Sequence, residues 1–69
     1  MNPLFVVLCD EYPNTIHLTE EDAIKASNDS PCPGPDVIQF TWNDALNCYE
    51  WDKTVYGYSR EMGKYIKKC

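Results

Sequence analysis

The chain has 69 residues, the length of one domain, and a formal net charge of −5. Its content of 43% hydrophobic and 13% aromatic residues argues against a disordered protein. No apolar run reaches the roughly 18 residues that a membrane-spanning helix needs, and the apolar stretch 4–9 is too short for a signal sequence and follows no basic segment. We therefore expect one cytoplasmic domain with no membrane partner.

The first predicted element is a strand at residues 4–8. This continuous apolar run, Leu-Phe-Val-Val-Leu, lies between Pro3 and the acidic pair Asp10-Glu11. A short run of this kind is typical of a strand that is buried on both faces. We expect it in the interior of a sheet.

A helix is predicted to begin after Thr19 and to run from about residue 20 to residue 28. The Thr19 hydroxyl can accept a hydrogen bond from the first turn, and Ala23, Ile24 and Ser27 form one buried stripe. Residues 30–36 contain three prolines and read as a linker, with a presented recognition loop as the alternative. Two interpretations, helix capping or a contact surface for a basic partner, remain open for the acidic residues of the first turn, Glu20, Glu21 and Asp22.

The second half of the chain, residues 37–68, is predicted to form an antiparallel β-meander. Its first part alternates apolar and polar residues, as a half-buried strand does. Asn43-Asp44, Asp52-Lys53 and Met62-Gly63 are candidate tight turns. Two-residue loops at these places would gather seven aromatic rings on one face of the sheet: Phe40, Trp42, Tyr49, Trp51, Tyr56, Tyr58 and Tyr65. The expected fold is thus α+β, with the N-terminal strand and one short helix packed on a meander.

Segments 43–52 and 59–68 also carry helix signals. Thr41 to Asp44 resembles a capping box, and Ser59 could cap a helix that presents Met62, Tyr65 and Ile66. Strand and helix remain alternatives for both segments.

Residues for catalysis or metal binding are not apparent. His17 is the single histidine, none of the four cysteines forms a Cys-x-x-Cys pair, and the three glycines form no phosphate-binding loop. We expect no enzyme activity, no cofactor and no metal site. In the cytoplasm the cysteines, Cys9, Cys32, Cys48 and Cys69, would be free thiols; in an oxidising compartment they would allow three pairings.

Charge is divided unevenly along the chain. Residues 1–52 contain ten acids and one base, giving −9, whereas residues 53–69 contain five bases and one acid, giving +4. This asymmetry bears on the choice of partner rather than on the fold. Small acidic proteins without chemistry of their own often block basic or nucleic-acid-handling host proteins, as inhibitors carried by phages and other mobile elements do.

We therefore expect a non-enzymatic protein-binding module whose partner has a basic surface. The predicted contact residues are Trp42, Trp51, Tyr56, Tyr58 and Tyr65, together with Glu20, Glu21 and Asp22, because exposed Tyr and Trp are enriched at contact hot spots. The competing interpretation is that all the rings are core. Nucleic acid bound by the aromatic and basic C-terminal strands is a second possible partner, which the acidic balance disfavours. A homodimer that buries the rings is a third.

Overall fold

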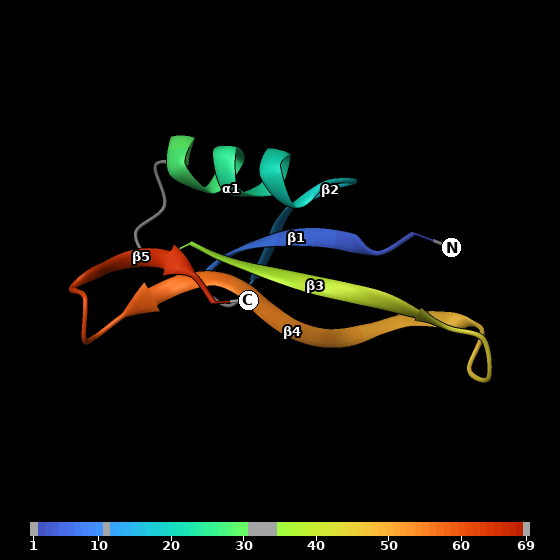
Figure 1. Cartoon of the computed structure of the whole chain (residues 1–69). Coiled ribbons are helices and arrows are strands. Elements are labelled where there is room, and N and C mark those ends of the chain that lie inside the picture. The colour runs from blue at the N-terminus through green and yellow to red at the C-terminus, as the bar shows by residue number, and fades with distance from the viewer. Residues whose placement is uncertain (1, 11, 31–34, 69) are drawn as a thin grey trace.

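The computed structural model describes residues 2–10, 12–30 and 35–68. These residues form one helix and a five-stranded antiparallel sheet with the strand order β2-β1-β3-β4-β5 (Figure 1). The elements are β1 (Leu4–Cys9), β2 (Tyr12–His17), α1 (Glu20–Asp29), β3 (Asp36–Asn43), β4 (Cys48–Ser59) and β5 (Lys64–Lys67). The predicted small α+β domain is confirmed.

The strand β1 lies in the interior of the sheet, as its apolar run predicts. It pairs with β2 on one side and with β3 on the other. Val6 pairs with Ile38 and Val7 with Val37, and all four side chains are buried. Since successive residues of a strand point to opposite faces, β1 contributes apolar groups to both faces of the sheet.

The helix α1 begins where the sequence predicts and ends one residue later than predicted, at Asp29. The Thr19 hydroxyl accepts a hydrogen bond from the Asp22 N–H at 3.2 Å, which satisfies one of the donors that the first turn leaves unpaired. α1 packs against β1, β2 and β3. We call the sheet face under α1 the helix face and the opposite one the open face. The core between α1 and the sheet consists of Phe5, Val7, Ala23, Val37 and Val55.

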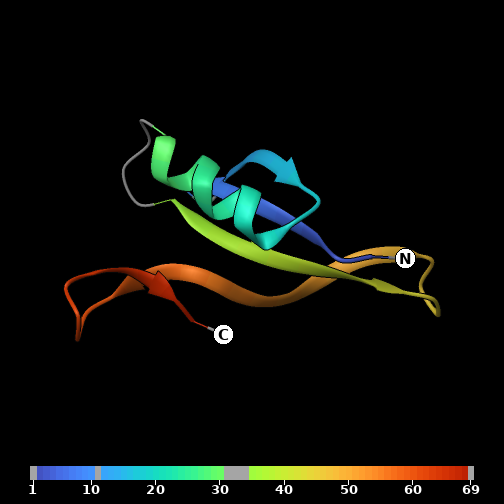
Figure 2. The same cartoon turned by 45° about the horizontal axis from the view of Figure 1, so that its top comes forward.

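No element in the described part of the chain covers the open face. Figures 1 and 2 show α1 on one side of the sheet only. Directly paired residues point to the same face of a sheet, so two rows of pairs define the open face. In one row Val6 pairs with Ile16 and Ile38, and in the other Phe40 pairs with Leu4 and Trp51. Val6 and Ile38 are nevertheless buried on this face.

One continuous strand, β4, replaces the predicted hairpin at Asp52-Lys53. The pairing with β3 shifts twice: Gln39 pairs with Lys53 but Phe40 with Trp51, and Val37 pairs with Tyr56 but Ile38 with Thr54. Each shift leaves one extra residue in β4, first Asp52 and then Val55, as in a β-bulge. The first bulge therefore lies at the position that the sequence analysis assigned to a turn, and the predicted turn is wrong.

The other two predicted turns exist but are longer than two residues, so the predicted registers are wrong. Residues 44–47 join β3 to β4, and residues 60–63 join β4 to β5. The Asn43 side-chain oxygen accepts from the N–H groups of Ala45 and Leu46, at 2.9 and 3.3 Å, and Asn47 has a φ of 55°. In the second turn the Gly63 N–H donates to the Ser59 carbonyl at 2.8 Å. The capping signals at these places thus start single turns that no helix continues.

One of the two described cysteines, Cys9, differs from the expectation of free thiols. Cys9 is disulfide-bonded, whereas Cys48 is a free, exposed thiol. Cys32 and Cys69 lie outside the described residues, as does most of the predicted proline-rich linker, residues 31–34. The expectation rested on the compartment inferred from the sequence. A disulfide also requires that the fold bring the Cβ atoms of two cysteines within about 4.5 Å of each other, and the sequence did not reveal that distance.

Candidate protein-binding surface

Four aromatic side chains gather on the open face where β3 and β4 pair. Phe40 lies across from Trp51, with ring centroids 5.8 Å apart and planes at 68°. Trp42 lies across from Tyr49, with centroids 5.2 Å apart and planes at 76°. Both pairs have the edge-to-face geometry that aromatic rings prefer. We call Phe40, Trp42, Tyr49 and Trp51 the open-face cluster.

Hydrogen bonds fix the orientation of two rings of this cluster. The Trp42 Nε1–H donates to the Asp44 carboxylate at 2.7 Å. The Tyr49 hydroxyl donates to the backbone carbonyl of Asn2 at 2.8 Å, and so connects the hairpin to the start of the chain. Rings that are held before a partner arrives lose less conformational freedom on binding.

The open-face cluster is only partly shielded from water. Trp51 is 56% exposed, and Phe40, Trp42 and Tyr49 are half-buried. At the end of the same hairpin, Leu46 is exposed as well. The expectation that every ring is core therefore does not hold for Trp51. A large exposed indole next to apolar neighbours has the composition of a contact hot spot.

Carboxylates surround this end of the hairpin. Asp44 accepts from Trp42, Glu50 accepts from the Asn43 side chain at 2.9 Å, and Asp52 accepts from the Gln39 side chain at 3.2 Å. No Lys, Arg or His occurs between Lys25 and Lys53 in the sequence. The β3–β4 hairpin is thus acidic as well as aromatic.

The remaining three rings form a separate tyrosine cluster, Tyr56, Tyr58 and Tyr65. Tyr65 stacks with Tyr56 at 5.9 Å and meets Tyr58 edge-on at 5.5 Å. The Tyr56 hydroxyl donates to the Asn28 side chain of α1 at 2.9 Å, which places the cluster on the helix side of the sheet. Burial raises the pKa of Tyr65, with smaller contributions from Asp36 and the two neighbouring phenols.

The prediction that all seven rings share one face is wrong. It required a hairpin at Asp52-Lys53, which would have set Tyr56 across from Tyr49 and brought Tyr58 to the same face. In the continuous strand β4, Trp51 pairs with Phe40 on the open face, whereas Tyr56 pairs with Val37 on the helix face. The structure brings Trp42 and Trp51 together and places Tyr56, Tyr58 and Tyr65 elsewhere.

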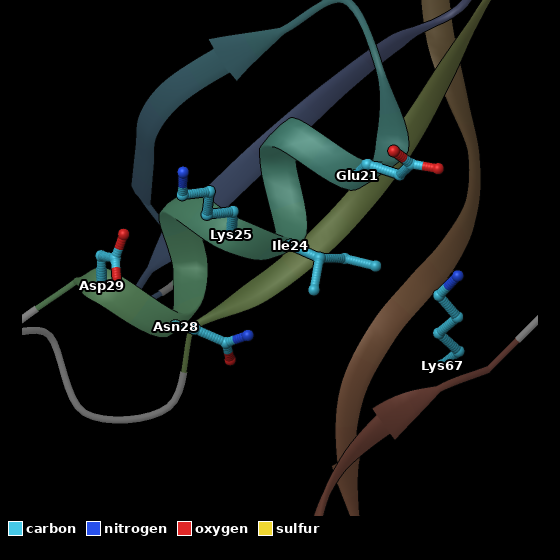
Figure 3. A pocket seen from close by; sticks show the side chains of 6 residues that line it. All are labelled: Glu21, Ile24, Lys25, Asn28, Asp29 and Lys67. Carbon is cyan, nitrogen blue, oxygen red and sulfur yellow. The ribbon is translucent and has the colours of Figure 1, made fainter.

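The acidic first turn of α1 lies on the helix side too. Glu20 forms an ion pair with Lys67 of β5 at 3.7 Å, while Glu21 and Asp22 are exposed. Between α1 and β5 is an open hollow with a volume of about 400 Å³ (Figure 3). Its lining residues are Glu21, Ile24, Lys25, Asn28, Asp29 and Lys67. Glu20, Glu21 and Asp22 therefore do not share a surface with the two tryptophans.

Two members of the open-face cluster, Phe40 and Tyr49, were not among the predicted contact residues. The alternation of Ile38, Phe40 and Trp42 was the signal for Phe40, because residues two apart share a face. The same alternation links Tyr49 to Trp51, two residues later, whereas its position opposite Trp42 follows only from the β3–β4 register. That register depends on a four-residue turn, which the sequence did not reveal.

Within the described ranges, no group of three or more His, Cys, Asp and Glu side chains is placed to hold a metal ion. The helix that the structure describes, α1, is neither long enough nor apolar enough to cross a membrane. The chain matches no protein-family model, no curated protein and no solved structure.

Proposed function

We propose that the chain is an acidic, non-enzymatic binding module that docks on a basic surface of another protein through the open-face cluster. The observation that carries the proposal is Trp51, a tryptophan more than half exposed on a sheet face that no described element covers. Burying such a ring in a partner's pocket removes a large apolar area from water. Tryptophan is also the residue most typical of binding hot spots.

The rigidity of the cluster supports this role. Trp42 and Tyr49 are oriented by hydrogen bonds and by their mutual edge contact. Phe40 supports one side of Trp51. A partner would therefore meet a surface whose shape is already set, and the entropy cost of docking is reduced accordingly.

Charge indicates the kind of partner. Asp44 lies beside the cluster and accepts from Trp42, while Glu50 and Asp52 lie on the same hairpin, bonded to Asn43 and Gln39. Complementary charge speeds association and selects among partners more than it adds affinity. A protein surface that normally holds nucleic acid is basic, so occupation by this hairpin would block it. The proposed activity is that of an inhibitor of the kind that phages and mobile elements carry.

Nucleic acid is the alternative partner, and the tyrosine cluster with its neighbouring lysines is the observation in its favour. Tyr58 is exposed and pairs with Tyr65, and Lys67 pairs with Tyr56 on the same face. However, the Tyr56 and Tyr65 rings stack on each other, and Lys67 pairs with Glu20. These groups are engaged within the fold, which leaves less stacking surface and less free charge for a polyanion.

A pull-down from bacterial lysate with two variants tests the proposal. The baits are the natural chain, Trp51→Ala, and Tyr58→Ala as the matched ring truncation on the other face. We expect the natural chain to capture one protein in a stoichiometric amount, and this binding should survive nuclease treatment. Tyr58→Ala should still bind the protein, whereas Trp51→Ala should not. Retention that vanishes with nuclease and depends on Tyr58 would instead identify nucleic acid as the partner and overturn the proposal.

The proposal requires the chain to act in the cytoplasm, where host proteins that handle nucleic acid are found. Disulfides are rare in that compartment, and Cys9 is disulfide-bonded. The pull-down is therefore run with and without a reducing agent. Capture of the same protein in both conditions is the expected result, because the open-face cluster contains no cysteine.

A further inference from the structure

The strand β2 and the residue after it form an uncharged, apolar edge. Residues 12–18, Tyr-Pro-Asn-Thr-Ile-His-Leu, contain no Asp, Glu, Lys or Arg in a chain that is 25% charged. Among the described residues, three of the four most exposed large hydrophobic side chains lie in this stretch: Leu18 at 77%, Tyr12 at 75% and Ile16 at 63%. The fourth is Leu46 at 64%.

The backbone of this edge is available for pairing. β2 is the first strand in the sheet order and pairs with β1 alone among the described strands, so one side of its backbone has no described strand beside it. The opposite edge strand, β5, carries Lys64 and Lys67 among its four residues. Charged side chains, lysine above all, are the usual protection against edge-to-edge pairing. β5 has that protection and β2 does not.

Two features limit how much of β2 can pair. Pro13 lacks a backbone N–H, and the register with β1 shifts between Val7 and Leu8, next to Asn14. Both lie in the first half of the strand. Thr15, Ile16 and His17 pair regularly with β1, and these residues with Leu18 make up the usable part of the edge.

We propose that this edge pairs with the same edge of a second copy of the chain, antiparallel and about a two-fold axis. An uncharged strand offers no charge for a charged partner to complement, whereas an identical strand provides matching backbone groups and matching apolar side chains without local repulsion. Such a dimer buries Ile16 and Leu18 and continues the sheet through both copies.

The net charge of −5 gives this dimer a distinctive dependence on salt. Two copies repel each other at long range, and added salt screens that repulsion. Higher salt should therefore strengthen the dimer. Binding of the acidic hairpin to a basic partner should respond in the opposite direction, so the two interactions can be told apart.

Sedimentation over about a hundredfold range of protein concentration tests the dimer, since dimerisation follows mass action. The variants are Ile16→Lys, and Leu46→Lys as a control of nearly equal exposure away from the edge. We expect the mass of the natural chain and of Leu46→Lys to rise toward twice that of the monomer. Ile16→Lys should remain monomeric at a concentration at least tenfold above the natural chain's midpoint.

Far-UV circular dichroism shows whether Ile16→Lys folds, and Leu18→Lys replaces it if it does not. A natural chain that stays monomeric throughout overturns the proposal, as does a dimer that persists in both lysine variants of the edge. If the natural chain is monomeric and Ile16→Lys abolishes capture of a lysate protein, the edge accepts a partner's strand instead. The sedimentation outcomes do not depend on Trp51, so a chain that stays monomeric leaves the proposed function standing.

Discussion

Trp51 of β4 lies directly opposite Phe40 of the neighbouring strand β3, with ring centroids 5.8 Å apart, and yet more than half of the Trp51 surface is exposed to water. The indole thus packs against Phe40 and still presents most of its surface to water. Complete burial of such a ring would stabilise the monomer further. The arrangement is the one expected of a residue that completes its packing against a partner.

Replacement of Ile38 by Ala tests whether the open face contributes to stability. Ile38 is 1% exposed although α1, the helix that the structure describes, lies on the other side of the sheet. Loss of a buried isoleucine side chain costs about 2–5 kcal/mol of the free energy of unfolding, whereas exposed substitutions stay within about 0.5 kcal/mol. We expect Ile38→Ala to fall in the first range and Ile16→Ala, on the same face, in the second. Urea unfolding measures the free energy of unfolding of both variants. Equal losses would contradict the conclusion that Ile38 is buried on the open face.

Thr19 should contribute to stability through the cap of α1. Its hydroxyl accepts the Asp22 N–H at 3.2 Å. Removal of an N-cap hydroxyl costs about 1 kcal/mol of the free energy of unfolding. Thr19→Ala should show this loss in chemical denaturation, and Thr19→Ser, which keeps the acceptor, should recover most of it. No difference between the two variants would indicate that the hydroxyl does not act as a cap.

Tyr65 should make the protein less stable at alkaline pH. Burial raises its pKa in the folded state above the ordinary value of 10.0. As the pH rises past that value, the unfolded chain loses this proton before the folded one does, so the free energy of unfolding falls. Below that pH the stabilising contribution is fully present.

Tyr65→Phe removes this titration. Denaturant unfolding between neutral pH and about pH 11 should show a weaker decline for Tyr65→Phe than for the natural chain. Tyr12→Phe, which alters a largely exposed ring, serves as the control and should behave like the natural chain. A decline that Tyr65→Phe leaves unchanged would contradict the prediction.

Local signals were sufficient for part of the fold. The apolar run 4–8 identified a buried interior strand, and Thr19 with the acids after it identified the start of α1 within one residue. Both signals lie within a few neighbouring residues. One is an apolar run that can be buried on both faces, and the other is a side chain that accepts a hydrogen bond from the backbone N–H three residues later.

The β3–β4 pairing could not be predicted, because its geometry depends on bulges and turn length. Asp52-Lys53 has the composition of a turn, but in the sheet Asp52 is the extra residue of a bulge. Each bulge changes which later residues share a face. The two bulges together restore the alternation, so Trp51 and Tyr56 lie on opposite faces because β4 continues as one strand through the predicted turn. The missing hairpin, and not the choice of strand over helix, divided the predicted contact residues between two faces.

The affinity of the captured protein for two matched variants tests the central claim most directly. Trp51→Ala and Tyr58→Ala each truncate one half-exposed ring, on the open face and on the helix face respectively. Loss of a central hot spot costs about 2 kcal/mol or more, close to 30-fold in Kd. The account predicts a loss of at least that size for Trp51→Ala and a change of less than about threefold for Tyr58→Ala, with both variants folded. Equal losses, or a larger loss for Tyr58→Ala, would contradict it.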